Sequence, residues 1–509
     1  MNLEKKNILL LKAAGGYNAV ANYIEEWAAA LRKAGCNTCV LDGWSLAMPM
    51  WYDHVISNCK FDMVLDCNGN LIPHGVPGNL PPEMIYGTYF NDHPGGVKRL
   101  KEVNERTIVF CCDNRFCDYT DRYFPMVKHK EFVPLSGSFY SEYVPYEERT
   151  TDIIFTGSYH EPEAYRTQII AEVKRAGGES EFVEDIMEDI IANSQYTFPE
   201  CLSRALRRHN RNMSDDEFRE FVRKNILIDY YARFYYRDKI MRSLLDAGLK
   251  VHVYGAGWKK LYPEYNKNLV INKGGYYAAR KALASSKFAL NVMPWFKEGF
   301  QERIASAMLN GVIAVTDEST YIRQEFEDGK DMLVYSLKEP ESLPGRLEYL
   351  LSHPKEAAEI AENGYQKGQN HTWAARVHDM MEKIKEEFGV SLSSEGEGRE
   401  LELELEFPDK RTAVLEAIYQ LQKMVDLTEN DVAAIDSLSV TDLEFLLQKF
   451  EKFVRQFSGR LDGMKMNDSV RNCICNQNRE ISKETLHLFS MQCKALIGRP
   501  LLEEEGLKI

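Results

Sequence analysis

The sequence predicts an α/β protein built from two doubly wound parallel sheets, and three features of the chain indicate this class. Short apolar runs alternate with helical patterns through residues 1–150 and again through residues 250–388. Strands that are buried on both faces give such runs, and helices between them give parallel connections. Glycine or small polar residues follow many of the runs, as at the ligand-binding edge of such a sheet. The length of 509 residues, 44% of them hydrophobic, suits about three domains.

The first unit is expected to span residues 1–150. An amphipathic helix is predicted over 18–33, because its apolar residues recur with helical spacing and Gly35 follows its last turn. The six predicted strands are 7–12, 37–42, 61–66, 84–90, 107–112 and 132–135. The segments that follow parallel strands meet at one edge of the sheet, so we expect the functional residues of this unit there.

The second unit is expected to span residues 151–390. Its first strand begins at Asp152 and ends at Gly157 and Ser158, and a helical insertion rich in Arg, Glu and Tyr is predicted over 160–245. The later strands are predicted at 250–254, 270–272, 288–292, 312–317 and 332–335. Helices are predicted at 277–286, between Gly299 and Gly311, at 343–351 and over 355–388.

The C-terminal part departs from this rhythm. Residues 391–408 hold six Glu and one Arg between Glu395 and Glu406, and Glu alternates with Leu from Glu400. We interpret this stretch as an acidic linker, with an edge strand as the alternative. Residues 409–509 show helical periodicity and are predicted to form a small helical bundle.

Composition and charge exclude several classes of function. The formal net charge of −14 argues against general nucleic-acid binding, and the sequence has no run of about 18 apolar residues to span a membrane. The apolar stretch near the start is too short for a secretory signal. The 11 cysteines are scattered, which does not suggest a disulfide framework, and Cys36 and Cys39 lack a second pair for metal binding. We therefore expect a cytoplasmic protein.

The most informative stretch runs from Glu298 to Gly311. Gly299 opens a helical pattern, Gly311 closes it, and an apolar strand follows. The N-terminus of that helix would present free backbone N–H groups and a partial positive charge, a geometry that suits a phosphate. Arg303 in the first turn would add a fork of donors. The stretch therefore predicts an anionic ligand.

Five segments carry a family resemblance. They are Asp152–Ser158, Val253–Trp258, Leu290–Pro294, Gly299–Asp317 and Asn370–Arg376. Together they resemble the donor domain of GT-B glycosyltransferases, in particular the bacterial CgeB-like, group-1 family. The similarity covers about residues 150–388, extends to 1–150 only as a general pattern and does not reach 408–509. It implies two Rossmann-like domains facing a cleft and hexosyl transfer from a nucleotide-sugar, with a UDP-sugar favoured as co-substrate and no other cofactor.

The resemblance also implies donor-binding residues. Glu298 matches the first of two family glutamates, whereas Ser306 stands where the second would grip the ribose diol. Serine cannot make that bidentate contact, so the ribose contact is open and Glu302, one turn earlier, is a candidate to replace it. Arg303 matches an arginine of the CgeB-like branch, expected to clamp the diphosphate. The other expected donor contacts are Gly157, Ser158, Gly255, Gly257, Asn291, Pro294, Gly299, Phe300, Thr316 and Asp317.

On the acceptor side the resemblance implies residues of the first unit. Gly15 and Gly16 resemble an acceptor-side glycine loop, with a tight turn as the alternative. Asp92 and His93 are the candidates for a catalytic base, and the alternative is that Asp92 caps a turn while His93 packs beside Pro94. Asp113 is a second candidate. A retaining reaction would need no base. The sequence has no Asp-x-Asp motif suited to a divalent cation, so metal-independent transfer is expected.

Several alternatives stay open at this stage. The insertion and the C-terminal bundle are expected to recognise a large acceptor, a protein or a glycan, and the bundle is equally suited to homodimerisation. A degenerate transferase that only binds a nucleotide-sugar or glycan is one rival, and Ser306 favours it. A nucleotide-sugar epimerase with two Rossmann-like domains is another.

Overall fold

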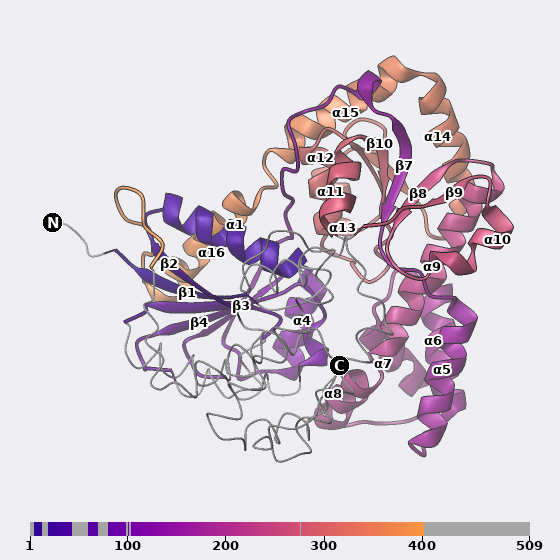
Figure 1. Ribbon diagram of the computed structural model, residues 1–509. Coiled ribbons are helices and arrows are strands. Elements are labelled where there is room, and N and C mark those ends of the chain that lie inside the picture. Colours follow the sequence, from indigo (N-terminus) through magenta and orange to yellow (C-terminus); the bar gives the residue numbers. More distant parts are fainter. Residues whose placement is uncertain are drawn as a thin grey trace, which may run out of the picture.

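The computed structural model describes residues 5–12, 19–42, 60–69, 80–97, 100, 103–274 and 276–401. They form two α/β units, and a group of helices flanks both of them (Figure 1). Each unit holds a six-stranded sheet in which all the strand pairs are parallel. The predicted class, α/β with two doubly wound sheets, is confirmed. None of the described helices is long and apolar enough to cross a membrane.

The first sheet has the strand order β2-β1-β3-β4-β5-β6. Its strands are β1 (Asn7–Lys12), β2 (Asn37–Asp42), β3 (Met63–Cys67), β4 (Ile85–Phe90), β5 (Thr107–Cys111) and β6 (His129–Phe132). The main helices are α1 (Ala19–Lys33) and α4 (Asn114–Tyr123), and a short 3-10 helix, η3 (Pro94–Gly96), follows β4. β3, β4 and β5 are buried throughout, which explains their unbroken apolar runs. The last strand begins three residues before the predicted 132–135, because His129–Phe132 pairs with β5 although all four residues are only half-buried.

The second sheet has the order β12-β11-β10-β7-β8-β9. Its strands are β7 (Thr151–Thr156), β8 (Val251–Tyr254), β9 (Leu269–Ile271), β10 (Ser286–Leu290), β11 (Ile313–Asp317) and β12 (Leu333–Tyr335). Its helices are η6 (Trp258–Lys260), α10 (Tyr262–Tyr265), α11 (Tyr276–Ala284), α12 (Glu302–Leu309), α13 (Thr320–Glu325), η7 (Pro340–Ser342), α14 (Leu343–Ser352) and α15 (Pro354–Gly368). From β7 the successive strands β8 and β9 extend the sheet on one side, and β10, β11 and β12 extend it on the other side. The boundary between β7 and β10 is therefore a switch point, where such sheets bind ligands.

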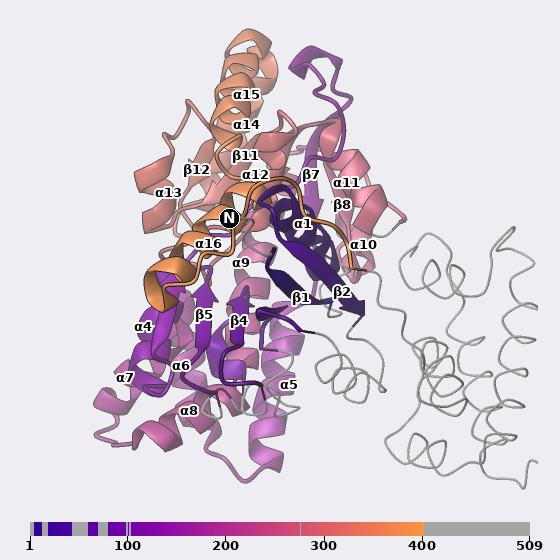
Figure 2. The same cartoon turned by 90° about the vertical axis from the view of Figure 1, so that its left-hand side faces the viewer.

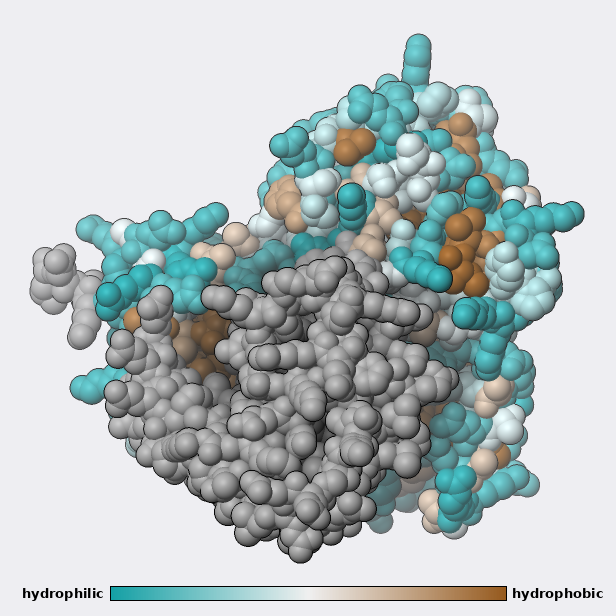
Figure 3. Space-filling view, viewed as in Figure 1, coloured by the Kyte–Doolittle hydropathy of each residue, from teal (hydrophilic) through white to brown (hydrophobic). Residues whose placement is uncertain are grey.

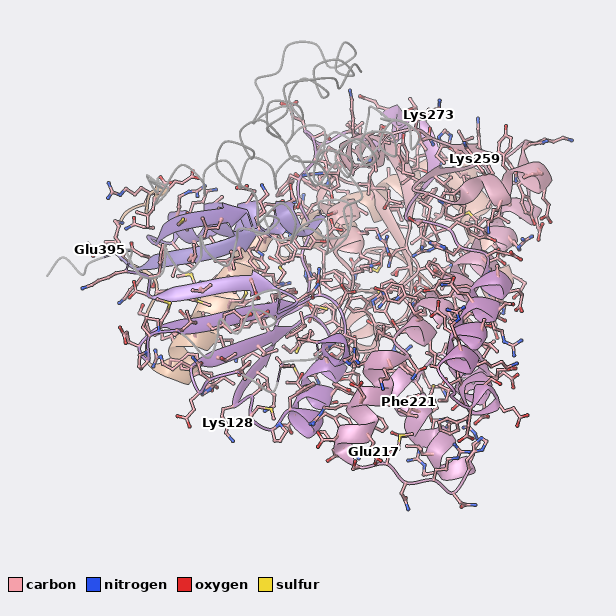
Figure 4. All side chains as sticks on the ribbon, turned by 60° about the horizontal axis from the view of Figure 1, so that its bottom comes forward. Lys128, Glu217, Phe221, Lys259, Lys273 and Glu395 are labelled. Carbon is pink, nitrogen blue, oxygen red and sulfur yellow. The ribbon has the colours of Figure 1, made fainter. Side chains whose placement is uncertain are left out.

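The insertion consists of α5 (Pro162–Arg175), α6 (Ser180–Ala192), α7 (Phe198–Arg208), α8 (Asp215–Lys224) and α9 (Leu227–Asp246). Capping boxes fix the starts of α7, with Thr197 and Glu200, and of α8, with Ser214 and Glu217. Figure 4 shows α8, which carries the labelled Glu217 and Phe221, beside the first unit. Phe218 of α8 stacks on Tyr123 of α4 with ring centroids 4.7 Å apart. The insertion thus bridges the two units.

The chain returns to the first unit at its end. Helix α16 (Trp373–Phe388) packs against α1, where Trp373 lies 5.8 Å from Trp27 and 4.5 Å from Tyr23, measured between ring centroids (Figure 2). Sequence alone groups α16 with the second unit, because nothing in its pattern shows which unit its apolar face meets.

Part of the predicted acidic linker is an edge segment. The Thr38 N–H of β2 donates to the carbonyl of Arg399 (3.0 Å), and the Leu401 N–H donates to the carbonyl of Thr38 (2.7 Å). The alternative of an edge strand therefore holds in part for residues 398–401. Residues 402–408 of the linker, the predicted bundle 409–509 and the loop with Gly15 and Gly16 lie outside the described residues. The visible surface of the insertion and of α14 and α15 is mainly hydrophilic (Figure 3).

Candidate functional site

A cavity of about 520 Å3 lies between the two units, at the carboxyl ends of their strands. It includes the switch point of the second sheet. Residues that line the cavity come from both units and from the insertion. The first unit contributes Tyr23, Asn68, Asn91 and Asp92, and the insertion contributes Tyr230, Arg233, Phe234 and Arg237. The second unit contributes Thr156, Gly157, Ser158, Tyr254, Gly255, Arg280, Trp295, Phe296, Gln301, Glu302 and Arg303.

Arg303 is a half-buried cation in the wall of this cavity. Its Nε donates to Asn291 Oδ1 (3.1 Å), and its Nη1 donates to the carbonyl oxygen of Thr156 (2.6 Å). Its Nη2 donates to Gln301 Oε1 (2.5 Å). All three acceptors are neutral, and no described carboxylate lies within ion-pair distance of Arg303. Burial lowers its pKa. A partly desolvated guanidinium whose hydrogen-bond partners are all neutral, with only the Glu302 carboxylate as a nearby negative charge, would be stabilised by an anion entering the cavity.

Helix α12 begins at this point. Its N-cap residue, Gln301, makes no capping hydrogen bond with its side chain, and Gln301, Glu302 and Arg303 all line the cavity. The first turn of the helix therefore places its partial positive charge at the cavity wall beside Arg303. The phosphate site that the sequence predicts at this helix N-terminus stays a prediction.

Glu302 is a carboxylate with one oxygen occupied and one available. Its Oε1 accepts hydrogen bonds from the hydroxyls of Tyr140 (2.8 Å) and Ser306 (2.6 Å). No described residue donates a hydrogen bond to its Oε2. Ser306 lies behind Glu302, where its hydroxyl also accepts from the backbone N–H of Ser138 (3.1 Å). Of these two positions, the structure thus places Glu302 at the cavity and Ser306 against the segment that joins the units.

Glu298, Gly299 and Phe300 do not line the cavity. Glu298 pairs with Arg115 of α4 (2.9 Å). A Cβ on Gly299 would lie 2.2 Å from the carbonyl oxygen of Cys112, so the close backbone approach expected here is made to the first unit instead of a ligand. Phe300 stacks on Tyr321 with centroids 5.1 Å apart. These three predicted donor contacts bind protein because the loop that carries them docks on the end of β5.

Asp113 holds that docked loop. Its Oδ2 accepts from the backbone N–H groups of Lys297 (2.7 Å) and Glu298 (2.9 Å), and its Oδ1 accepts from the N–H of Arg115 (2.9 Å) at the start of α4. Burial raises its pKa to about 6. The residue that we expected on the acceptor side is therefore a buried strut between the units and does not line the cavity.

The two base candidates lie in different environments. Asp92 lines the cavity, with 54% of its side chain exposed, and its Oδ2 accepts from Asn68 Nδ2 (3.2 Å). His93 lies outside the cavity, where its Nδ1 accepts from the Gly95 N–H (3.0 Å) and its ring packs on Tyr119 (4.5 Å between centroids). Burial lowers the pKa of His93 to about 4. The packing alternative describes His93, and Asp92 alone faces the cavity.

The remaining predicted donor residues divide into two groups. Gly157, Ser158 and Gly255 line the cavity, and Gly255 has a φ of +140°. Gly257, Asn291, Pro294, Thr316 and Asp317 do not line it.

Four of those residues, Asn291, Thr316, Asp317 and Gly257, have structural surroundings instead. Asn291 supports Arg303 from behind and donates to the Thr316 hydroxyl (3.0 Å). Asp317 is buried and accepts from the Met293 N–H (2.7 Å), and burial raises its pKa to about 7. At Gly257 a Cβ would lie 1.9 Å from the carbonyl oxygen of Tyr159.

Sequence reasoning missed the cavity residues of the insertion and of α11. Tyr230, Arg233, Phe234 and Arg237 lie on one face of α9, and this helical spacing was the available signal. Arg280 of α11 donates to Asn22 Oδ1 (2.8 Å) and packs over the Tyr140 ring. The described part of the chain contains no group of three or more His, Cys, Asp or Glu side chains that could hold a metal ion.

A family comparison bears on this site. Residues 237–382 match the family described as glycosyl transferase-like. The match covers less than a third of the chain, from α9 into α16, and includes Glu302 and Arg303. It supports a group-1 glycosyltransferase and gives no support to an epimerase. Two parallel sheets that face a shared cavity are the arrangement of the GT-B fold. No curated protein matches the sequence.

Solved structures resemble the chain only remotely. Sucrose-phosphate synthase from Thermosynechococcus elongatus is 13% identical, with a TM-score of 0.44 over 76% of this chain and 100% of that one. Anabaena HepE in complex with UDP-glucose is 10% identical, with a TM-score of 0.43 over 75% and 99%. An alpha-glucosyltransferase in complex with UDP-glucose and DNA containing an abasic site is 10% identical, with a TM-score of 0.48 over 75% and 100%.

Proposed function

We propose that this protein is a metal-independent glycosyltransferase that moves a hexosyl group from a UDP-sugar to a hydroxyl acceptor. The observation that carries the proposal is Arg303, a half-buried guanidinium in the cavity wall whose hydrogen-bond partners are all neutral. The first turn of α12 adds a second source of positive potential at the same point. The glycosyl transferase-like match over this segment supports the assignment.

The charges of the cavity suit a diphosphate. Of the described residues, four arginines line it, Arg233, Arg237, Arg280 and Arg303, together with two carboxylates, Asp92 and Glu302. Arg233 is paired with Asp229 of the same helix, so Arg237, Arg280 and Arg303 are the arginines that would meet the diphosphate of a nucleotide-sugar, which carries about two negative charges. Because protein cations meet this charge, the proposed reaction needs no divalent metal.

In the proposed reaction the bond between the anomeric carbon and the diphosphate oxygen breaks, and its electron pair leaves with the diphosphate. Arg303 and the α12 amides stabilise the negative charge that develops there. The acceptor oxygen forms the new bond to the anomeric carbon and loses its proton to Asp92, the cavity carboxylate of the first unit. Glu302 Oε2 accepts a hydrogen bond from the ribose, in place of the glutamate absent at position 306. A base-assisted reaction of this kind inverts the anomeric configuration.

A second candidate function is a nucleotide-sugar binder without transfer. Glu298 and Ser306, the two positions that correspond to the family's acid pair, both face protein instead of the cavity. That arrangement favours a site which has lost part of its catalytic equipment.

One experiment separates the two functions. The purified full chain is incubated with UDP, UDP-glucose, UDP-N-acetylglucosamine, UDP-galactose and GDP-mannose; the melting temperature is measured for each, and the release of free nucleotide for each nucleotide-sugar. Stabilisation together with nucleotide release supports a transferase, because transferases also pass their sugar slowly to water. Stabilisation without release supports the binder. If neither the nucleotide-sugars nor UDP stabilise the chain, both proposals are wrong.

A further inference from the structure

The longest helix of the insertion reaches into the cavity. Tyr230, Arg233, Phe234 and Arg237 of α9 stand at positions i, i+3, i+4 and i+7, and all four line the cavity. Since residues with this spacing share one face of a helix, α9 presents a continuous wall of aromatic and arginine side chains. The insertion is therefore part of the site and not merely an addition outside it.

Arg233 is the fixed cation of this wall. Its side chain is only 11% exposed, and its Nε and Nη2 lie 2.8 Å and 2.6 Å from Asp229 Oδ2, one turn earlier on α9. The guanidinium packs over the rings of Trp295 and Tyr230, with its carbon 3.9 Å and 4.6 Å from their centroids. An arginine held by an ion pair and by two aromatic rings has little freedom to move.

The one guanidinium nitrogen not bound to Asp229 faces Asp92 across the cleft. Arg233 Nη1 lies 3.8 Å from Asp92 Oδ1, within ion-pair distance but too far for a hydrogen bond. Asn68 donates to the other oxygen, Oδ2, at 3.2 Å. Arg233 and Asn68 thus hold the Asp92 carboxylate from two sides, while Oδ1 keeps its lone pairs available for a substrate hydroxyl.

We propose that Arg233 is a positioning residue through which the helical insertion orients the Asp92 carboxylate toward the acceptor hydroxyl. The inference rests on the proposed function, in which Asp92 takes the proton. In this arrangement the first unit supplies the base, the second unit holds the donor diphosphate, and the insertion fixes the distance between acceptor and base. The insertion then contributes to catalysis in addition to any contact with a large acceptor.

The test compares substitutions at Arg233 with a matched control on the same helix. Arg242 also pairs with an aspartate four residues earlier, Asp238 (3.0 Å), but it does not line the cavity. Arg233→Gln, Arg233→Lys and Arg242→Gln are made in the full chain. Hydrolysis of UDP-glucose, or of whichever donor from the panel above turns over fastest, is followed as nucleotide release, and UDP affinity is measured by calorimetry.

We expect Arg233→Gln to lower kcat by about tenfold or more, with KM and UDP affinity changed by less than about twofold. Arg233→Lys should recover part of kcat, because it restores a positive charge near Asp92. Arg242→Gln should lose similar thermal stability and keep its kcat. In an Asp92→Asn background, Arg233→Gln should cause little further loss of kcat, because a residue that acts through Asp92 has nothing left to orient.

Three results would overturn the inference. A full further loss of kcat in the Asp92→Asn background would mean that Arg233 acts independently of Asp92. A loss of UDP affinity with unchanged kcat would make it a donor contact. An equal loss of kcat in Arg242→Gln would make the effect structural. By contrast, a wild-type chain that binds no donor refutes the proposed function itself, and a donor that binds while Asp92→Asn turns over normally refutes only the base and its positioning.

Discussion

Replacement of Arg303 by methionine should separate function from stability. The substitution removes the half-buried charge and keeps a flexible apolar side chain of similar length. It leaves three acceptors without their donor, of which only one, the Thr156 carbonyl, belongs to the backbone. The loss of those hydrogen bonds is opposed by relief from desolvating a cation whose hydrogen-bond partners are all neutral. We therefore expect the free energy of unfolding to change by no more than about 1 kcal/mol.

The effect on the ligand should be much larger. A hydrogen bond from a charged donor to a phosphate oxygen contributes about 1.5–3 kcal/mol, which corresponds to about a 10- to 150-fold loss of affinity. Calorimetric titration of UDP into wild type and Arg303→Met measures this loss, and urea denaturation without nucleotide measures stability. The expected result is weak binding by a variant whose fold is almost unchanged in stability.

Arg149 provides the matched control for a buried arginine with a structural role. It is buried, it donates to four backbone carbonyls, those of Ala284 and Ser286 (both 2.9 Å), Val144 (2.5 Å) and Asn310 (2.8 Å), and it does not line the cavity. Arg149→Met should cost about 2–4 kcal/mol of stability and leave UDP affinity unchanged where the chain is folded. If Arg303→Met destabilises the chain as much as Arg149→Met and UDP affinity stays the same, Arg303 is a structural residue and the proposed diphosphate site is wrong.

Three further predictions concern the buried Asp113 between the units, the proposed ribose contact of Glu302, and residues 409–509. Burial raises the pKa of Asp113 in the folded chain to about 6, above the usual 3.8, so the free energy of unfolding should fall by about 3 kcal/mol as the pH rises from about 4 to 6. Asp113→Asn should remove this pH dependence, measured by urea denaturation. Identical pH profiles for the wild-type and variant chains would contradict the prediction. Glu302→Gln should reduce the ratio of the affinities for UDP and 2′-deoxy-UDP, both measured by calorimetry, because a neutral amide oxygen accepts a weaker hydrogen bond from the ribose than a carboxylate does. An unchanged ratio would exclude Glu302 as the ribose contact. Deletion of residues 409–509 should abolish transfer to a large acceptor but leave UDP binding intact, and loss of UDP binding would refute a role in acceptor recognition.

The parts of the fold that sequence alone predicted well are those governed by local pattern. β1 and β2 have the predicted bounds, because each is an apolar run closed by turn residues. The sequence also places Arg303 in the first turn of α12, because Arg303 follows Gly299 and lies at the start of a helical pattern of apolar residues. Both features are local.

The errors all depend on contacts between distant parts of the chain. The loop with Glu298 has the composition of a ligand loop, yet it docks on Asp113, and no pattern within either segment indicates that pairing. His93 follows a strand at the ligand edge, but the aromatic side chains of α4 enclose it. The charged face of α9 could be found from helical spacing, whereas its approach to Asp92 depends on how the insertion lies against the first unit.

The return of α16 to the first unit has a practical consequence for anyone who dissects this chain into fragments. A fragment that stops near residue 150 would leave Tyr23, Trp27 and Tyr89 without the Trp373 indole that covers them, and would bare the β2 edge that residues 398–401 occupy. Uncovered aromatic surface and a naked strand edge both promote self-association. The N-terminal sheet should therefore be expressed with residues 373–401 joined back through a designed linker, or studied only within the whole polypeptide.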